Sequence, residues 1–270
     1  MIKFFKSIRQ ELVMKNNTSK YFKYAIGEVV LVMVGILLAL QVNNWNNKRL
    51  EKQLEVNVLK QARVDIQSML NDMKGDQEIL KLGINSHLNI NSYIKDDVVY
   101  NDSMCFDFHW LMRDEYMYPI TSAYDILKDK GLDLIENDSI RQGLQNVFEF
   151  MLPRISKENP FYPDLEEFFS DFYRRNFSVN NNQKLEYTQK FDSYEFKYPY
   201  KNTFDGRVYD VQIGYVPNDF EALKSNSEFQ VLLRQSFRYR TFKYNRYQSA
   251  IHILEGLHKK ISEELNIPDD

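Results

Sequence analysis

Hydrophobic residues follow two different patterns along the chain. Residues 24–42 are apolar almost without interruption, and only Glu28 and Gln41 break the run. As a helix rising about 1.5 Å per residue, this run would extend roughly 28 Å, which matches the hydrocarbon core of a bilayer. Beyond residue 43, apolar residues recur every three or four positions, as on one face of a helix. The first pattern predicts a transmembrane helix, and the second predicts a helical domain.

Residues 43–95 indicate that the transmembrane helix continues directly into a long amphipathic helix. Gly75 and Gly83 are the expected bends, because glycine in a helix interior costs about 1 kcal/mol relative to alanine. The apolar stripe lacks strict heptads, which favours packing within the domain over a coiled-coil stalk. The stripe consists of Leu54, Val58, Ala62, Ile66, Met69, Met73, Leu80, Ile84 and Leu88.

Capping residues predict a helical hairpin in the middle of the chain. Ser122 and Asp125 form a capping box for a helix that ends at Gly131. Asn137 or Asp138 begins the next helix, because either side chain can accept a hydrogen bond from the first free amide groups. The two helices are expected to lie side by side.

Further helices are expected before and after this hairpin. Residues 104–112 are apolar and aromatic enough to form a buried helix or turn. Pro163 is a favoured first-turn residue and is expected to begin another helix. Ser225 and Glu228 form a capping box for a closing helix that runs to about Asn266. This helix is long enough to pair antiparallel with the helix that leaves the membrane.

Residues 176–219 interrupt the helical pattern. The segment is rich in tyrosine, and Asp205 and Gly206 form a turn signal between alternating residues. We expect an irregular insert with a possible short β-hairpin. The predicted fold class is therefore all-α, with an N-terminal transmembrane helix that continues into a long helix, followed by an antiparallel helical bundle with this insert.

Positively charged residues predict the orientation of the span. The residues before it include six Lys and Arg but one acid, Glu11, so the positive-inside rule places the N-terminus in the cytoplasm. The small residues of a signal-peptidase site are missing after the apolar run, so an uncleaved anchor is expected. The predicted domains are a cytoplasmic basic amphipathic segment (1–23), a transmembrane helix (24–42) and an extracytoplasmic helical domain (43–270).

One face of the predicted transmembrane helix combines an acid with small residues. Glu28, Gly35 and Ala39 are spaced at i, i+7 and i+11. Gly35 and Ala39 form a small-xxx-small pair, which lets two helix backbones approach closely. We therefore hypothesise self-association, or binding of a membrane protein partner, through this face. The alternative is that Glu28 extends to the cytoplasmic surface or is protonated.

Cations interleaved with aromatic residues mark the predicted closing helix. Guanidinium groups and aromatic rings together can bind an anionic glycan or lipid head group through bidentate hydrogen bonds and stacking. The alternative is that these cations pair with the acids of residues 164–171 on a neighbouring helix. The candidate anion-binding residues are Arg234, Arg238, Arg240, Lys243 and Arg246.

Composition and motifs narrow the function classes. With 43% hydrophobic residues and a net charge of -3, the chain is neither disordered nor a basic nucleic-acid-binding protein. Cys105 is the single cysteine, which excludes an intramolecular disulfide. The common hydrolase, phosphate, zinc-protease and dinucleotide motifs are missing. No catalytic, cofactor-binding or metal-binding residue is predicted, and this favours a protein without enzymatic activity.

Two blocks resemble a family of bacterial single-span membrane proteins of unknown function. The first is AIGEVVLVMVGILLALQVNNWN (residues 25–46), preceded by a short basic segment, and the second is SAYDILKDKGLDLIENDSIRQGL (residues 122–144). Asp129 and Lys130 depart from the family's pattern, which more often has serines there. The resemblance implies a membrane anchor and an extracytoplasmic helical domain, but no activity or catalytic residue. We expect the anchor to lie in the bacterial inner membrane and the domain to be periplasmic or otherwise extracytoplasmic.

The predicted function is a membrane-anchored extracytoplasmic module that acts in interaction, scaffolding or sensing. The alternative function is binding of an anionic envelope ligand. The expected partners are the lipid bilayer and either a second copy or another membrane protein, with no nucleic acid and no cofactor. A deep pocket holding unpaired carboxylates or histidine would instead favour an enzyme, whereas a flat apolar patch would favour a protein partner.

Overall fold

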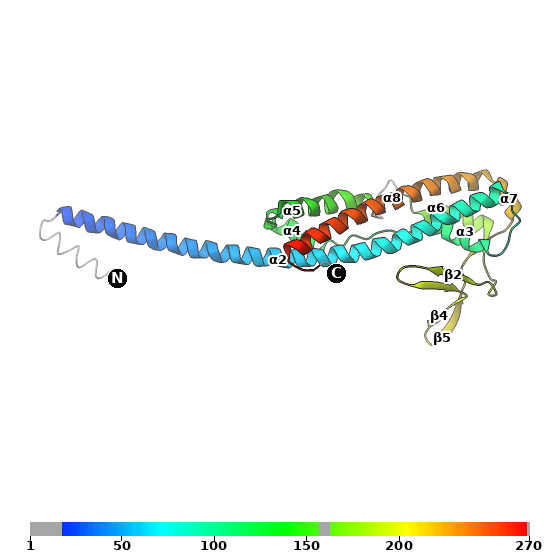
Figure 1. Cartoon of the computed structure of the whole chain (residues 1–270), viewed down its shortest axis with the longest axis horizontal. Coiled ribbons are helices and arrows are strands. Elements are labelled where there is room, and N and C mark those ends of the chain that lie inside the picture. The colour runs from blue at the N-terminus through cyan, green and yellow to red at the C-terminus, as the bar shows by residue number, and fades with distance from the viewer. Residues whose placement is uncertain (1–17, 157–162, 269–270) are drawn as a thin grey trace. The chain divides into compact units, whose positions relative to one another are not determined.

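The computed structural model describes residues 18–156 and 163–268, and most of these residues are helical (Figure 1). The chain divides into two compact units, Met1–Asn57 and Val58–Asp270. The all-α prediction holds for most of the described chain, although short strands occur in the second unit. The predicted basic segment (1–23) lies largely outside the described residues, which begin at Thr18.

Helix α2, Thr18–Lys95, is a continuous α-helix of 78 residues. Its residues 29–53 are all exposed, and among them Leu31 and Val42 are 59% and 64% exposed. Of the helices in the described ranges, α2 is the one that is long and apolar enough to cross a membrane, by length and composition. The apolar run therefore does continue into a long helix, as the sequence predicts.

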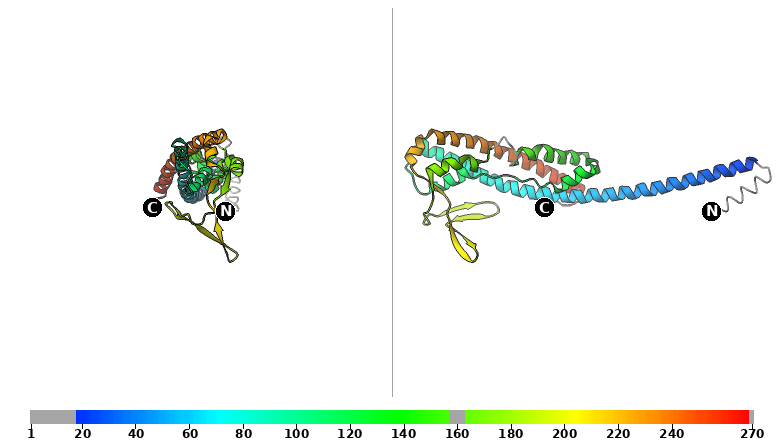
Figure 2. Two further views of the ribbon diagram at one scale, coloured as in Figure 1. Left: turned by 90° about the vertical axis from the view of Figure 1, so that its right-hand side faces the viewer. Right: turned by 180° about the vertical axis from the view of Figure 1, so that it is seen from behind.

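In the second unit, α8 (Ser227–Glu264) lies antiparallel to the part of α2 after residue 58 (Figure 1, Figure 2). Side-chain contacts show the direction: Arg63 Nε donates to Ser262 Oγ over 2.9 Å, near the end of α8. Farther along α2, Asp76 accepts a hydrogen bond from Tyr247, over 3.1 Å and nearer the middle of α8. The predicted antiparallel pairing of the two long helices is confirmed.

Shorter helices complete the helical part of the second unit. The sequence predicts the end of α4 correctly, because Gly131 follows it with φ +97°. The predicted cap of α5 is also correct, since the Asn137 side chain accepts from Ser139 N over 3.0 Å. The elements are α3 (Met104–Met112), α4 (Ser122–Lys130), η1 (Leu132–Leu134), α5 (Asp138–Gln145), a π-helical turn η2 (Asn146–Met151), η3 (Leu152–Arg154), α6 (Leu165–Asn176) and α7 (Phe220–Ser225).

Three predicted helix starts are wrong by one or two residues. Helix α6 begins at Leu165 and not at Pro163, because the Asp164 side chain caps it. The Ser122 hydroxyl does not cap its own helix, because it donates to Asp65 of α2 over 2.6 Å. Asp65 also accepts from Ala123 N over 3.1 Å, so a carboxylate of the long helix satisfies one of the first amide groups of α4. Helix α8 is capped by Asn226 and not by Ser225, because Ser225 is the last residue of the separate helix α7.

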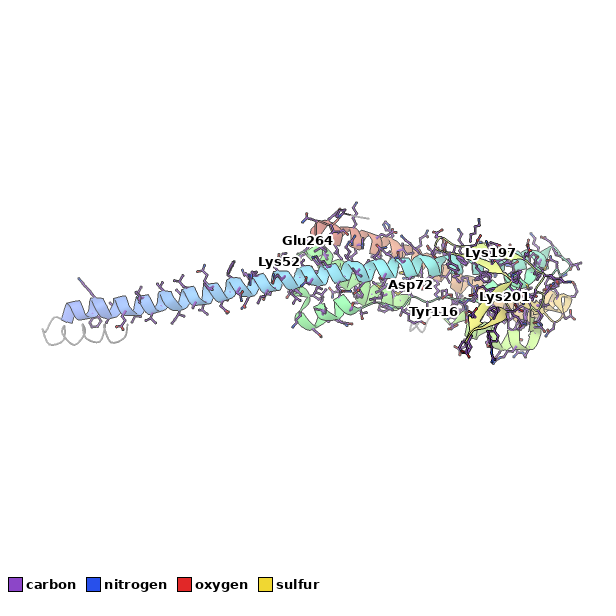
Figure 3. All side chains as sticks on the ribbon, turned by 90° about the horizontal axis from the view of Figure 1, so that it is seen from below. Lys52, Asp72, Tyr116, Lys197, Lys201 and Glu264 are labelled. Atoms are coloured by element: carbon purple, nitrogen blue, oxygen red, sulfur yellow. The ribbon has the colours of Figure 1, made fainter. Side chains whose placement is uncertain are left out.

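The insert is more regular than expected. It contains three antiparallel strand pairs, and the predicted turn at Asp205 and Gly206, with φ +48° and +70°, joins one of them. Figure 3 marks Lys197 and Lys201 on strands of this insert. The pairs are β1 (Phe177–Val179) with β6 (Tyr215–Pro217), β2 (Tyr187–Lys190) with β3 (Glu195–Tyr198), and β4 (Tyr200–Phe204) with β5 (Arg207–Val211).

Aromatic side chains fill the core around α3. Phe108, Phe169 and Phe229 have no exposed surface, and Phe172 stacks on Phe229 with ring centroids 5.6 Å apart. Burying one such side chain stabilises a fold by about 1.5 to 3 kcal/mol. These four residues therefore contribute a substantial part of the hydrophobic stabilisation of the domain. They hold α3 in position between α6 and α8. The chain that leaves α3 then runs along the cavity described below.

Helix α2 passes through Gly75 and Gly83 without a break, and the two glycines differ in their surroundings. A Cβ atom on Gly83 would lie 2.5 Å from Nε and 2.8 Å from Cζ of Arg240, whereas a Cβ on Gly75 would meet nothing within 4 Å. Arg240 is fully buried, so its guanidinium has little freedom to move aside. Gly83 is therefore required for the close approach of α8. The close packing, and not the bend that we predict from the sequence, explains the glycine at this position.

The same substitution at the two glycines should change stability in opposite directions. Gly83→Ala is expected to lower the free energy of unfolding by about 1 to 3 kcal/mol, because it overpacks the Arg240 site. Gly75→Ala, the matched control, is expected to raise it by up to about 1 kcal/mol through helix propensity. Chemical denaturation of the two variants measures both effects. A gain in stability for Gly83→Ala would contradict the close packing of α2 and α8.

Candidate functional site

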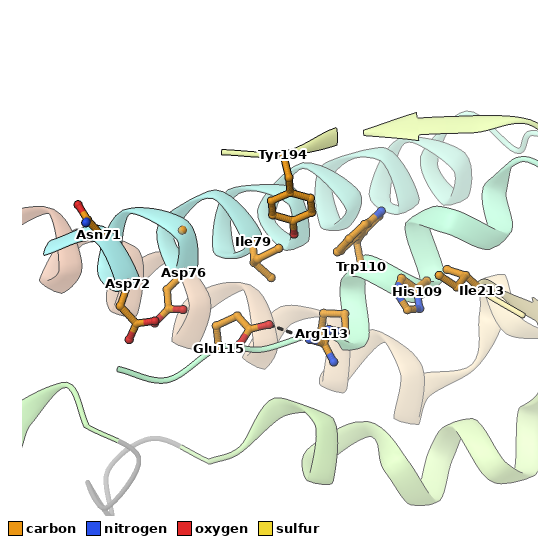
Figure 4. A pocket seen from close by; sticks show the side chains of 11 residues that line it. Asn71, Asp72, Asp76, Ile79, His109, Trp110, Arg113, Glu115, Tyr194 and Ile213 are labelled. Carbon is orange, nitrogen blue, oxygen red and sulfur yellow. Dashed lines mark hydrogen bonds and ion pairs between the residues drawn. The ribbon is translucent and has the colours of Figure 1, made fainter. Parts of the chain in front are cut away.

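A cavity of about 520 Å³ opens in the second unit, and we name it the α2–α3 cavity (Figure 4). Its volume lies in the range of small-molecule sites, about 300 to 1,000 Å³. Three parts of the chain supply its walls. They are Asn71, Asp72, Gly75, Asp76 and Ile79 from α2, His109, Trp110, Arg113 and Glu115 from α3 and the residues after it, and Tyr194 and Ile213 from the insert.

Two carboxylates from α2 lie at one end of the cavity. Asp72 and Asp76 are one helical turn apart and therefore share a face, and Figure 4 shows them close together. Asp76 is only 9% exposed, and its Oδ2 accepts a hydrogen bond from Tyr247. Within the described ranges, no ion pair joins either carboxylate to a cation. Two carboxyl groups thus face the cavity without an ion-pair partner.

The environment of Asp76 favours its protonated form. Burial has the largest effect and, with the neighbouring Asp72 and Glu115 carboxylates, raises the pKa of Asp76 from 3.8 to about 7. The hydrogen bond from Tyr247 and the charge of Lys243 act in the opposite direction. Burial also raises the pKa of Asp72 above its ordinary value. The cavity therefore holds a carboxylate that can gain or lose a proton near neutral pH.

Aromatic side chains line the cavity beyond these carboxylates (Figure 4). Trp110 is 8% exposed and donates from Nε1 to the Tyr187 hydroxyl over 2.8 Å. The Tyr194 ring stacks on Phe191, with centroids 4.4 Å apart. Both rings are thus held in place by residues of the insert. The insert that the sequence pattern leaves uncertain has a definite use, because Tyr194 and Ile213, in the connections beside its strands, form a wall of the cavity.

The remaining charged groups of the cavity are already neutralised. Arg113 forms ion pairs with Glu115 over 2.7 Å and with Glu166 over 2.8 Å. Burial, followed by the charge of Arg113, lowers the pKa of His109 to about 4, so this imidazole is neutral at pH 7. Arg113 is therefore not free to compensate Asp72 and Asp76.

The segment that follows α3 is held against α8 by a buried ion pair. Lys243 Nζ lies 2.9 Å from Asp114 Oδ1, and the two side chains are 6% and 2% exposed. The same ammonium lies 3.3 Å from the centroid of the Tyr116 ring. Asp114 Oδ2 also accepts from Leu165 N at the start of α6 over 3.3 Å. One carboxylate therefore connects three parts of the domain.

Two further side chains of α8 bind the backbone of this segment. Arg240 Nη2 donates to the carbonyl oxygens of Leu111 and Arg113, over 2.7 and 3.0 Å. Tyr247 accepts from Met117 N over 2.6 Å while it donates to Asp76. Burial lowers the pKa of Arg240 to about 10, so the guanidinium is still charged at neutral pH. These contacts fix the wall of the cavity that carries Arg113.

The predicted anion-binding cations are not brought together on one surface. Arg240 is fully buried and Lys243 is 5% exposed, because residues three apart share a helix face and this face packs against α2 and residues 111–117. Arg234, Arg238 and Arg246 are exposed. The prediction of one five-residue patch is therefore wrong.

The alternative prediction, that the acids of residues 164–171 pair with these cations, does not describe the two buried ones. Lys243 pairs with Asp114, which lies outside the predicted set, and Glu166 pairs with Arg113. Arg240 makes its two hydrogen bonds to backbone carbonyls. The polar residues of α8 thus act as internal supports of the cavity.

The predicted membrane-association face lies on the first unit. Gly35 and Ala39 are exposed, and a Cβ atom on Gly35 would meet nothing within 4 Å. Glu28, on the same face, is half-buried. Self-association through these residues stays a prediction.

Asp76 is the main residue of the cavity that sequence reasoning missed. A signal was present, because Asp76 occupies the position between Met73 and Leu80 where the apolar stripe of α2 should continue. Met73 and Leu80 are fully buried, so the acid between them has to lie at the packed face. An acid within a buried stripe requires a partner or a protonated state.

Among the described residues, no group of three His, Cys, Asp or Glu side chains is arranged to hold a metal ion.

Comparisons of this chain with protein families, curated proteins and solved structures return no match. The resemblance carried by residues 25–46 and 122–144 therefore stays a prediction.

Proposed function

We propose that this protein is a single-span, membrane-anchored binding module with a sensory or interaction role. In this proposal residues 24–42 cross the bacterial inner membrane, the N-terminus is cytoplasmic, and the helical domain binds a small ligand in the periplasm. One observation carries the proposal: α2 bears the exposed apolar run, and farther along it supplies five lining residues of the α2–α3 cavity. The same helix thus belongs to both the anchor and the binding site.

The exposed side chains of the apolar run support the membrane anchor. Val29, Leu37 and Val42 are 65%, 59% and 64% exposed, and the residues between them are exposed as well. Removing one such side chain from water is favourable by about 1.5 to 3 kcal/mol, and the run contains many of them. A helix also satisfies its own backbone hydrogen bonds, as the bilayer interior requires. Lipid is therefore the favoured surrounding for this part of α2.

Cysteine labelling in cells tests the anchor and its orientation. The native Cys105 is buried and its pKa is raised to about 12 by burial and nearby acids, so the parent chain should not react with a membrane-impermeant maleimide. Lys197→Cys in the insert should be labelled from the periplasmic side, whereas Lys23→Cys should be labelled only after the membrane is disrupted. Labelling of Lys23→Cys from outside, or recovery of the protein in the soluble fraction, would contradict the proposal.

Self-association is the form of interaction that the span supports. Gly35→Leu should reduce photocrosslinking between copies from a probe at Val32, because the added side chain prevents close approach of two backbones. Gly27→Leu is the matched control, since Gly27 lies eight residues away and about 80° around the helix. If Gly35→Leu leaves the crosslinked dimer at the parent level, self-association through this face is wrong.

Acid–base catalysis is a second candidate function, and the protonation of Asp76 favours it. A carboxyl group whose pKa lies near 7 is suited to proton transfer at neutral pH. Binding is preferred for two reasons. Asp76 already accepts a hydrogen bond from Tyr247, and the nearby ammonium group of Lys243 is paired with Asp114. Once a ligand is identified, mass spectrometry of the mixture after incubation distinguishes the two: a changed ligand with the parent and an unchanged one with Asp76→Asn would establish catalysis.

A further inference from the structure

We infer that the α2–α3 cavity binds a small organic cation, with its ammonium group beside Asp72 and Asp76 and its apolar part against Trp110 and Tyr194. This inference rests on the proposed binding function and names the chemical class of the ligand. It follows from the charges, the rings and the volume of the cavity.

The charge of the cavity walls is negative. Asp72, Asp76 and Glu115 are its acids, and Arg113 is its one cation among the described lining residues. Arg113 already pairs with Glu115, and it also pairs with Glu166, which is outside the cavity lining. His109 is neutral at pH 7 because burial lowers its pKa to about 4. The uncompensated charge is therefore that of Asp72, together with that of Asp76 when it is ionised, and a cation is the ligand that neutralises both.

The ionised forms of Asp72 and Asp76 also repel each other, because the two residues lie one turn apart on α2. Like charges at positions i and i+4 of a helix are destabilising, and here Asp76 is buried as well. Burial, followed by the charge of Asp72, raises the pKa of Asp76 to about 7. A bound ammonium group would favour the ionised forms of both acids, so binding should release a proton from Asp76. By linkage, the affinity for the cation should increase as the pH rises through about 7.

The aromatic walls favour an organic cation over a metal ion. Trp110 and Tyr194 line the cavity, and aromatic rings attract ammonium groups and cover alkyl or aryl carbon atoms. A metal ion needs several ligand atoms at short distances, and no set of three suitable side chains is arranged for one within the described ranges. A volume of about 520 Å³ holds a molecule with an ammonium group and an apolar body.

Other ligand classes fit the walls less well. An anion would face two carboxylates without a free cation to bind it, because Arg113 is paired twice. A neutral apolar molecule would leave Asp76 desolvated and without a charge partner. A cation with an apolar body satisfies the acids and the rings together.

Tryptophan fluorescence of the full chain in detergent micelles can test this inference. The chain has two tryptophans, Trp45 on the first unit and Trp110 in the cavity, so Trp45→Phe leaves Trp110 as the single reporter. Three probes of similar shape differ in charge: phenethylamine, 2-phenylethanol and 3-phenylpropionate. The amine should bind at least about tenfold more tightly than the alcohol, because a charge-assisted hydrogen bond replaces a neutral one. The carboxylate probe should bind least.

Asp72→Asn is the decisive variant, because Asp72 is exposed and its replacement should leave the fold intact. It should weaken binding of the amine about tenfold and leave the alcohol unaffected. Asp129→Asn, an exposed acid of α4, is the matched control and should change neither. Asp76→Asn should abolish the pH dependence of amine binding.

The outcomes distinguish the ligand class from the binding function. Equal binding of the three probes, or equal binding of the amine by the parent and Asp72→Asn, would overturn the cation assignment and leave a binding cavity. If none of the probes changes the Trp110 fluorescence at millimolar concentration, the binding function itself is contradicted, and the cation assignment with it.

Discussion

Asp114→Ala should lower the free energy of unfolding by about 3 to 5 kcal/mol, the largest effect that we expect from one substitution outside the hydrophobic core. The reason is that Lys243 stays in an interior site, 6% exposed, after its partner at 2.9 Å has been removed. Burial removes the water that solvates an ammonium group, and without a counter-charge nothing offsets this unfavourable free energy. Chemical denaturation of the full chain in detergent, followed by Trp110 fluorescence in the Trp45→Phe background, measures the loss.

The double variant Asp114→Ala, Lys243→Met separates the stranded charge from the other contacts of Asp114. It removes the ammonium together with the carboxylate, so it should recover about half of the lost stability. The remainder belongs to the hydrogen bonds that Leu165 N and Glu115 N donate to Asp114. If the single variant loses less than about 1 kcal/mol, the ion pair is more hydrated than the structure indicates.

Asp76 should make the domain less stable as the pH rises from about 4 to about 7. The pKa of this carboxyl is 3.8 ordinarily and about 7 in the folded chain. In that window the folded state binds the proton and the unfolded state has lost it, so rising pH favours unfolding. About three pKa units correspond to roughly 4 kcal/mol. At about pH 8, Asp76→Asn should therefore be more stable than the parent by roughly 2 to 4 kcal/mol, and near pH 4 the two should be equal.

The comparison with Asp76→Asn is needed because other groups titrate in the same window. Burial lowers the pKa of both His87 and His109 to about 4, so these imidazoles make the domain more stable as the pH rises to their ordinary 6.5. The difference between the two unfolding profiles cancels this opposite effect. Asparagine still accepts the Tyr247 hydrogen bond, which makes it a close match for protonated aspartic acid. A difference that does not vary with pH would contradict the raised pKa.

Local features of the fold could be predicted because they depend on neighbouring residues. The end of α4 at Gly131 and the cap of α5 at Asn137 are examples, since each depends on a few backbone groups nearby. The starts of α4 and α8 could not be predicted to the residue. Asp65, 57 positions before Ser122, takes the hydroxyl that would otherwise cap α4.

The candidate site could not be predicted from spacing alone. Arg240 and Lys243 are cations in a segment rich in cations and aromatic rings, which is typical of a surface that binds anions. Their burial follows from the packing of α8 against the chain after α3, with contacts 129 positions apart. A helix can bury polar side chains where carbonyl oxygens and a carboxylate face them. No local pattern indicates where those acceptors are.

The long apolar run, its continuation into a helix and the antiparallel pairing of α2 with α8 could all be predicted from the sequence. These features depend on the period and length of apolar stretches, which are properties of consecutive residues. The role of the polar residues on the packed faces depends instead on the tertiary fold. Asp76 meets Tyr247 from 171 positions away, and Gly83 makes room for Arg240. Whether an acid is ionised, or a cation is exposed, depends on the dielectric and the partners that distant segments bring to it.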